Sequence, residues 1–211
     1  MVGTFDLEEQ HWDLDAKLVA AAERLGQALR VMLRREAQRH GLSPIQLQVL
    51  VQVGQRAYPK RVGALAARFD VSAPTLSDAV AALEAKGLVR RRPGTDDRRA
   101  VELELTEDGR EVAESAEGWA ELARGLAAAL PRESKLEAFE TLTALIAGLQ
   151  AEGVVTVARM CRTCRFLREG TDTPYHCALL DLPLRRDDLR VDCPEHEPRG
   201  ERAVGGRRTS P

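Results

Sequence analysis

The chain has 211 residues, of which 44% are hydrophobic, 30% charged and 4% aromatic, with a formal net charge of -2. This length suits one ordinary domain with a small addition, and the balanced charge excludes attraction of nucleic acid by overall positive charge. No stretch reaches the ~18 uncharged apolar residues of a membrane-spanning helix. Residues 1–15 lack the basic start and apolar run of a signal peptide, so we expect a cytoplasmic protein with no membrane partner.

Two helices are predicted near the start of the chain. Residues 13–40 carry apolar side chains at spacings of three and four, and Gly41 is typical of a helix end. Ser43 and Pro44 are typical of an N-cap and a first helical position. A second helix is therefore expected to begin there and to stop near Gly54.

The next segment predicts a helix-turn-helix. A short helix fits residues 61–69, the turn "DVS" follows, and Ser72 caps a helix that continues to Gly87. That second helix is long enough to enter the major groove of B-DNA, and Arg61 and Arg68 of the first helix are placed to reach the DNA backbone. The residues expected to face DNA from the start of the second helix are Ser72, Ala73, Pro74, Thr75, Ser77 and Asp78. The carboxylate of Asp78 repels phosphates, so a capping or hydrogen-bonding role is favoured for it.

A β-hairpin, or wing, is predicted directly after the helix-turn-helix. Leu88 and Val89 begin its first strand, and apolar and polar residues alternate over 100–105, as in a half-buried strand. The hairpin carries five arginines, which are Arg90, Arg91, Arg92, Arg98 and Arg99. An arginine at a hairpin tip fits the minor groove, and Asp97 is placed to hold Arg99 through a bidentate pair. So many arginines favour DNA contact over solvated surface charge.

Charge is distributed unevenly along the chain. Residues 60–99 contain nine Lys or Arg against five Asp or Glu, whereas residues 102–152 contain four against twelve. A basic segment beside an acidic one predicts that only the helix-turn-helix and wing meet a polyanion.

Two further helices are expected, one from Thr106 to about Ala129 and one over 132–152, separated by Pro131. Together with the helix at 13–40 they present more apolar surface than one small domain can bury, so a homodimer is expected rather than a monomer. The tail 199–211 is polar and rich in Gly and Arg, which predicts disorder.

The ordered motifs "LSPIQLQVL", "VGALAARFDVSAPTLSDAVAALEAKGLVRR" and "DDRRAVELELT" resemble the MarR family of winged helix-turn-helix transcription regulators. The resemblance covers about residues 10–155, and its wing signature joins Asp97, Arg99 and Leu105-Thr106. It implies an obligate homodimer that binds pseudo-palindromic double-stranded DNA, usually as a repressor. It also implies that the first helix and the last two long helices form the dimer interface.

All four cysteines lie in the last quarter of the chain, in the pattern Cys161-x2-Cys164-x12-Cys177-x15-Cys193. A Cys-x-x-Cys pair supplies two thiolates from one turn, and two more from distant loops close a tetrahedral site. Residues 158–198 hold few large apolar side chains, so a segment of this size needs a staple such as a metal. His176 and His196 lie near cysteines and are open alternatives as ligands.

The identity of the metal stays open at this point. Zn2+ is favoured because it is the commoner occupant of isolated four-cysteine sites. An iron–sulfur cluster is the alternative, since Cys193-Pro194 is typical of a cluster-ligand context and Arg162, Arg165 and Arg168 would offset its charge. A thiol redox switch without metal is the third possibility.

We therefore predict a mainly α fold with a small β-wing, made of a MarR-like domain (1–155), a cysteine-rich metal or cluster module (156–198) and a disordered tail (199–211). The predicted function is that of a homodimeric DNA-binding transcription regulator, and no enzyme, modulated by a small-molecule effector or by the four-cysteine centre. The alternatives are an iron–sulfur redox protein and a protein-interaction adaptor with a winged helix domain. The absence of a nucleophile–base pair or cofactor loop in 1–155 disfavours the first, and the arginines of the wing disfavour the second.

Overall fold

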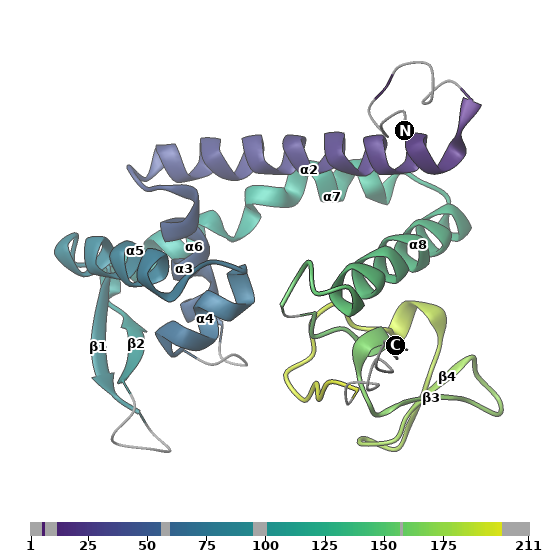
Figure 1. Cartoon of the computed structure of the whole chain (residues 1–211). Helices are drawn as coiled ribbons and strands as arrows, with labels where there is room; N and C mark the ends of the chain where they lie inside the picture. Colours follow the sequence, from purple (N-terminus) through teal and green to yellow (C-terminus); the bar gives the residue numbers. More distant parts are fainter. Residues whose placement is uncertain (1–5, 7–11, 56–59, 95–100, 157, 200–211) are drawn as a thin grey trace, which may run out of the picture. The chain divides into compact units, whose positions relative to one another are not determined.

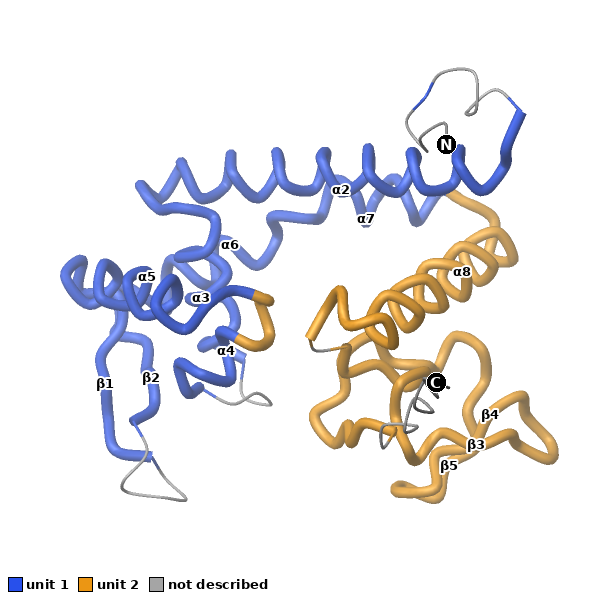
Figure 2. Tube along the Cα trace, viewed as in Figure 1, with its two compact units in different colours: residues 1–66, 71–129 blue, residues 67–70, 130–211 orange. Residues whose placement is uncertain are grey.

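The computed structural model describes residues 6, 12–55, 60–94, 101–156 and 158–199, and these residues form a mainly helical chain with small antiparallel sheets (Figure 1). By their internal contacts the residues separate into two compact units (Figure 2). The first comprises residues 1–66 and 71–129, and the second comprises residues 67–70 and 130–211. Among the described residues, no helix is both long enough and apolar enough to span a membrane.

The first unit contains the predicted winged helix. Its elements are α2 (Leu14–Arg39), α3 (Pro44–Gly54), α4 (Val62–Phe69, whose last turn belongs to the second unit), α5 (Ala73–Ala85), β1 (Val89–Pro93), β2 (Val101–Leu105), α6 (Glu107–Ala116), the 3-10 helix η1 (Glu117–Ala120) and α7 (Glu121–Ala128). The structure confirms, to within two residues, the two wing strands and the helices predicted at 13–40, 44–54, 61–69 and 72–87. Local signals explain this agreement, because Ser43 and Gln46 form a capping box at the start of α3 and Ser72 caps α5.

Helix α3 lies at the centre of this unit, where it packs against α5, α6 and β2. Its side chains Leu47, Val49 and Leu50 are fully buried. Leu76, Val80 and Leu83 of α5 are buried as well, and Leu103 of β2 also lies in the core. Burial of this kind stabilises the position of α5 and leaves its opposite face in solvent.

The start of α6 is fastened to the end of α5. The hydroxyl of Thr106 donates to the carbonyl of Gly87 at 2.6 Å and accepts from the amide of Gly109 at 3.0 Å. A Cβ added at Gly109 would lie 1.8 Å from the carbonyl oxygen of Leu88. Only glycine therefore permits this close approach of α6 to Leu88, in the short connection between α5 and β1.

The single helix predicted from Thr106 to Ala129 is wrong. The structure places a 3-10 turn, η1, between α6 and α7, and Gly118 lies within it. Glycine has the weakest helix propensity after proline, and a 3-10 segment inside a helix accommodates such a weak point. The periodic pattern of apolar residues continues across this break, which is why the sequence alone did not reveal it.

The second unit contains α8 (Arg132–Ala151), the 3-10 helix η2 (Cys161–Thr163), β3 (Leu167–Glu169), β4 (Tyr175–Cys177), β5 (Leu182–Leu184) and the 3-10 helix η3 (Arg186–Asp188). The three strands form an antiparallel sheet in the order β3-β4-β5, which the sequence analysis did not predict. Strands of three residues are too short to show a period of two. Helix α8 groups with the cysteine-rich segment, whereas the division drawn from the sequence lay at residue 155.

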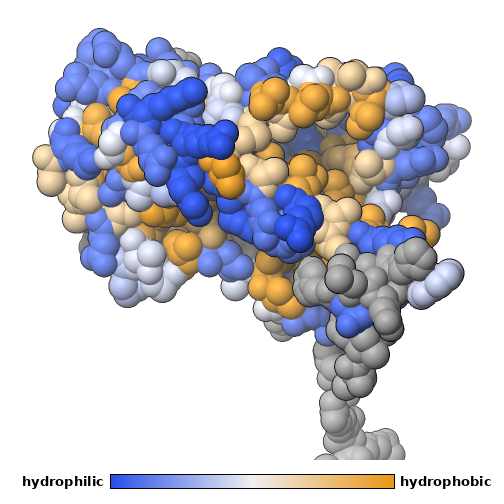
Figure 3. Space-filling model, turned by 90° about the horizontal axis from the view of Figure 1, so that it is seen from above, coloured by the Kyte–Doolittle hydropathy of each residue, from blue (hydrophilic) through white to orange (hydrophobic). Residues whose placement is uncertain are grey.

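Large apolar side chains remain exposed on three helices. In α2, Leu14 is 76% exposed, and in α7 Leu122 and Leu126 are 69% and 67% exposed. Helix α8 exposes Leu142, Leu145, Ile146 and Leu149 to between 38% and 47%. Groups of apolar residues also stand out among hydrophilic ones on the molecular surface (Figure 3). Apolar surface of this extent is typical of an interaction face.

Candidate functional site

The predicted recognition helix α5 exposes the surface expected of it. Ser72, Ala73, Pro74, Thr75 and Asp78 are exposed, and Ser77 is half-buried. The N-terminal half of the helix thus presents its short polar side chains to solvent.

The first two hydroxyls of this surface also have a structural role. The amide of Thr75 donates to Ser72 Oγ at 3.2 Å, and the two hydroxyl oxygens lie 2.7 Å apart. Ser72 is therefore the N-cap of α5, as predicted, and its hydroxyl also contacts that of Thr75.

The two arginines of the preceding helix lie in different surroundings. Arg61 is exposed and comes immediately before α4. Arg68 is half-buried and forms an ion pair with Asp192, and both of these residues belong to the second unit. Of the two, Arg61 is the more accessible to solvent.

The arginines of the first wing strand are all paired with carboxylates. Arg90 Nε lies 2.8 Å from Glu104 Oε2, across the hairpin from it. Arg91 Nε lies 3.0 Å from Glu84 Oε2, and Arg92 pairs with Glu102 at 3.5 Å. The hydrogen bond from Arg90 lowers the pKa of the Glu104 carboxyl, so this pair is charged at neutral pH.

These pairs partly neutralise the wing. Arg90 and Arg91 stay exposed, so both guanidinium groups can still reach an anion. The predicted tip residues Asp97, Arg98 and Arg99 lie outside the described residues.

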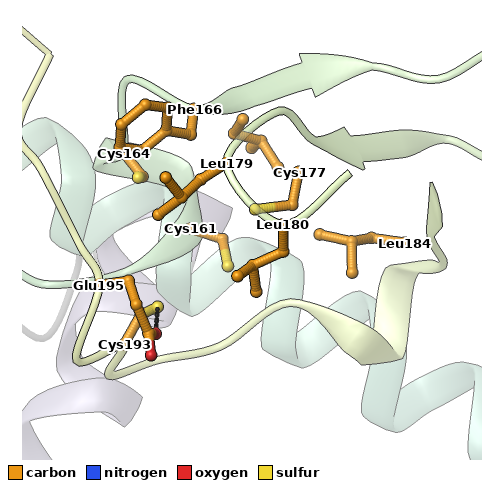
Figure 4. A pocket seen from close by; sticks show the side chains of 10 residues that line it. Cys161, Cys164, Phe166, Cys177, Leu179, Leu180, Leu184, Cys193 and Glu195 are labelled. Carbon is orange, nitrogen blue, oxygen red and sulfur yellow. Dashed lines mark hydrogen bonds between the residues drawn. The ribbon is translucent and has the colours of Figure 1, made fainter. Parts of the chain in front are cut away.

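The four cysteines lie in the second unit around one cavity of about 30 Å³ (Figure 4). Cys161 begins η2, Cys164 follows it, Cys177 ends β4, and Cys193 lies in the loop after η3. Their sulfur atoms face a common space into which Leu179 and Leu180 also project. The remaining lining residues are Phe166, Leu167, Leu184 and Glu195.

Backbone hydrogen bonds hold the two loops that carry three of these thiols. The amide of Cys161 donates to the carbonyl of Arg190 at 3.0 Å, and the amide of Cys193 donates to that of Arg159 at 2.9 Å. Cys164 pairs with Pro198 in an isolated β-bridge. The arrangement of the thiols thus depends on contacts between residues that are far apart in sequence.

All four cysteines are free thiols in this structure. Burial raises the pKa of both Cys161 and Cys193. The backbone amide of Arg190 lies 3.2 Å from the sulfur of Cys161, and its guanidinium Nη1 lies 3.8 Å from the sulfur of Cys193. Both groups would stabilise negative charge on these sulfurs.

The two histidines left open by the sequence are engaged elsewhere. His176 Nε2 lies 3.1 Å from Asp181 Oδ1. His196 Nε2 lies 3.0 Å from the hydroxyl of Thr163, and burial lowers the pKa of this imidazole. Neither histidine lines the cavity among the residues that surround it.

Comparison with known families supports the resemblance to the MarR family that the sequence motifs indicated. The model of the MarR family matches residues 40–100, which contain α3, α4, α5 and β1. The resemblance inferred from the sequence motifs is confirmed over this segment. Among curated proteins, no sequence matches the chain.

Solved structures share the fold. The transcriptional regulator PA3341 is 25% identical, with a TM-score of 0.56 over 63% of this chain and 98% of that one. CouR from Rhodococcus jostii RHA1, bound to p-coumaroyl-CoA, is 24% identical, with a TM-score of 0.53 over 64% of this chain and 92% of its own. MepR from S. aureus, in a complex with DNA, is 18% identical, with a TM-score of 0.53 over 62% of this chain and 97% of its own.

Proposed function

We propose that this chain, whose residues 40–100 match the model of the MarR family, is a transcription regulator that binds double-stranded DNA as a homodimer. The observation that carries the proposal is the exposed N-terminal half of α5 beside a wing with exposed arginines. A helix presented in this way enters the major groove, while the wing contacts the neighbouring backbone or minor groove. The chain has a net charge of -2, but its helix-turn-helix and wing are locally basic. DNA is therefore attracted to this segment alone.

The homodimer is proposed from the exposed apolar side chains. Leu122 and Leu126 of α7 and Leu14 of α2 expose more than half of their surface in the single chain. A second copy that covers these helices removes the apolar surface from water and gives a two-fold symmetric pair of recognition helices. Such a pair reads two half-sites separated by about 10 base pairs, which is one turn of B-DNA. Occupation of such a site near a promoter makes repression the expected outcome.

A signal is proposed to reach the dimer through α8. The cysteine loop is bound to this helix by Arg162, which contacts Thr143. The segment η3 is bound to it by Arg186, which contacts Glu133 and Glu140. The same helix exposes apolar residues such as Leu145. A change in the cysteine centre therefore shifts the helix that offers a dimer contact, and with it the distance between recognition helices. A small-molecule effector acting on the same equilibrium is the second candidate.

Selection of DNA from a random-sequence pool tests the proposed function. We expect recovery of an inverted repeat with half-sites about 10 base pairs apart, bound by two chains, with an affinity that falls steeply with salt. The Arg61→Ala and Arg99→Ala variants should bind the recovered site more weakly. Recovery of no sequence that binds better than the starting pool would contradict sequence-specific DNA binding.

A further inference from the structure

The cavity of the second unit is surrounded by every cysteine of the chain, although these residues are spread over 33 positions of sequence. Its other walls are mainly leucine and phenylalanine side chains. We propose that the four cysteines hold an iron–sulfur cluster, with one iron–thiolate bond from each of Cys161, Cys164, Cys177 and Cys193. This assignment does not depend on whether the protein binds DNA.

The cavity between the thiols favours a cluster over one zinc ion. Four thiolates on one zinc lie at about 2.3 Å from a single point and therefore about 3.8 Å from one another, with no space between them. The four sulfurs instead surround a cavity of about 30 Å³. A cluster places several irons and sulfides between its cysteine sulfurs and so matches thiols that line a shared cavity.

The surroundings also suit an anionic centre. Four thiolates exceed the positive charge of a cluster core, so the bound centre is negative overall. The backbone N–H of Arg190 points to the sulfur of Cys161, and the guanidinium of the same residue approaches Cys193. Hydrogen bonds to cluster sulfurs and a nearby positive charge both stabilise such a centre. Apolar side chains that include Leu179 and Leu180 form much of the wall around it.

The ligand set is complete without histidine. His176 is paired with Asp181, and His196 is paired with Thr163. Insertion of an assembled cluster by ligand exchange breaks the S–H bond of each thiol and one iron–ligand bond of the cluster donor. One iron–sulfur bond then forms at each cysteine, and each proton passes to a departing donor ligand. The exchange consumes no oxidant or reductant.

The test is the metal and sulfide content of the full chain purified without oxygen. We expect iron and acid-labile sulfide in equal amounts, about two or about four of each per chain, with a broad visible absorbance that dithionite bleaches. Protein that arrives without metal should gain the same spectrum after anaerobic incubation with sulfide, ferric iron and excess dithiothreitol, which reduces part of the iron to the ferrous state. One zinc per chain without sulfide, or no metal after this incubation, would overturn the proposal.

Matched variants test the ligands. Each of the four Cys→Ser variants should lose most of the iron, whereas His176→Asn and His196→Asn should keep the wild-type content. Loss of the cluster in a histidine variant that retains its helical circular dichroism would overturn the four-cysteine ligand set. The wild-type measurement decides the question even if a cysteine variant fails to fold.

Discussion

The guanidinium Nε of Arg162 lies 2.9 Å from the hydroxyl oxygen of Thr143. Arg162 stands between Cys161 and Cys164, and Thr143 is 96% buried in α8 and donates its own proton to the carbonyl of Phe139 at 2.8 Å. One hydroxyl thus joins the cysteine loop to the backbone of the helix. This relationship gives the proposed centre a direct contact with a helix that exposes apolar surface.

Thr143→Val should weaken that link without changing the ligands. The substitution keeps the branched shape but removes the acceptor, so we expect a loss of about 1 kcal/mol in the free energy of unfolding and unchanged iron content. The ratio between the DNA affinities of the metal-loaded and metal-free protein should move toward one. Thr141→Val, at an exposed position of the same helix, is the control. An unchanged ratio in Thr143→Val would show that the signal takes another route.

Acid should loosen the attachment of η3 to α8. The hydrogen bond from Arg186 lowers the pKa of Glu140 below its ordinary value of 4.5. A carboxyl with a lowered folded pKa contributes stability above its unfolded pKa and loses it as the pH falls through the folded value. The melting temperature of wild type should therefore decrease below about pH 4.5 more steeply than that of Glu140→Gln. Glu137→Gln, an exposed position of the same helix, should retain the wild-type pH profile.

Gly109→Ala should destabilise the first unit. The new Cβ would lie 1.8 Å from the carbonyl oxygen of Leu88, so the backbone must shift at the junction of α5 and α6. Overpacking of this kind costs about 1–3 kcal/mol, which urea unfolding monitored by circular dichroism would measure. Gly63→Ala is the matched control, because a Cβ there meets nothing within 4 Å, and it should be neutral or stabilising. Equal stability of the two variants would argue against the packing seen at Leu88.

Leu126→Glu should convert the proposed dimer into a monomer. Leu126 is 67% exposed in the single chain, and a charge buried at an apolar interface is strongly unfavourable. Analytical ultracentrifugation should show a dimer for wild type and a monomer for the variant at the same concentration. Arg124→Ala changes an exposed residue of the same helix that pairs with Glu121, and it should remain dimeric. A dimeric Leu126→Glu variant would place the interface away from α7.

The pairing of Arg90 with Glu104 predicts opposite effects at the wing. Arg90→Ala should weaken binding to the selected DNA and reduce the slope of log affinity against log salt by about 0.9 if one phosphate contact is lost. Glu104→Gln should strengthen binding, since it removes the carboxylate that competes with DNA for the guanidinium. Fluorescence anisotropy over a salt series would measure both. If Arg90→Ala matches wild type in DNA affinity and in salt slope, Arg90 does not contact DNA and only pairs with Glu104 within the hairpin.

Local signals in the sequence were sufficient for most of the first unit. Ser43 and Ser72 cap helices, and Gly41 and Gly87 end helices with positive φ. The alternation of apolar and polar residues indicated β2. Each of these signals acts within a few residues of the chain. The MarR resemblance also came from motifs read in order, and the family model confirmed it over residues 40–100. The break at η1 was missed because a glycine such as Gly118 ends a helix in one context and is tolerated in another.

Only the tertiary structure decided the partners of the charged residues and the geometry of the thiols. The sequence showed five arginines in the wing, but the opposition of Arg90 to Glu104 depends on strand register. The sequence predicted that four cysteines share a site, while their separation around a cavity depends on the β3-β4-β5 sheet and on backbone bonds such as Cys161 to Arg190. Side-chain type and helix signals are local properties of the chain, whereas ion pairs and ligand spacing are set by contacts between residues far apart in sequence.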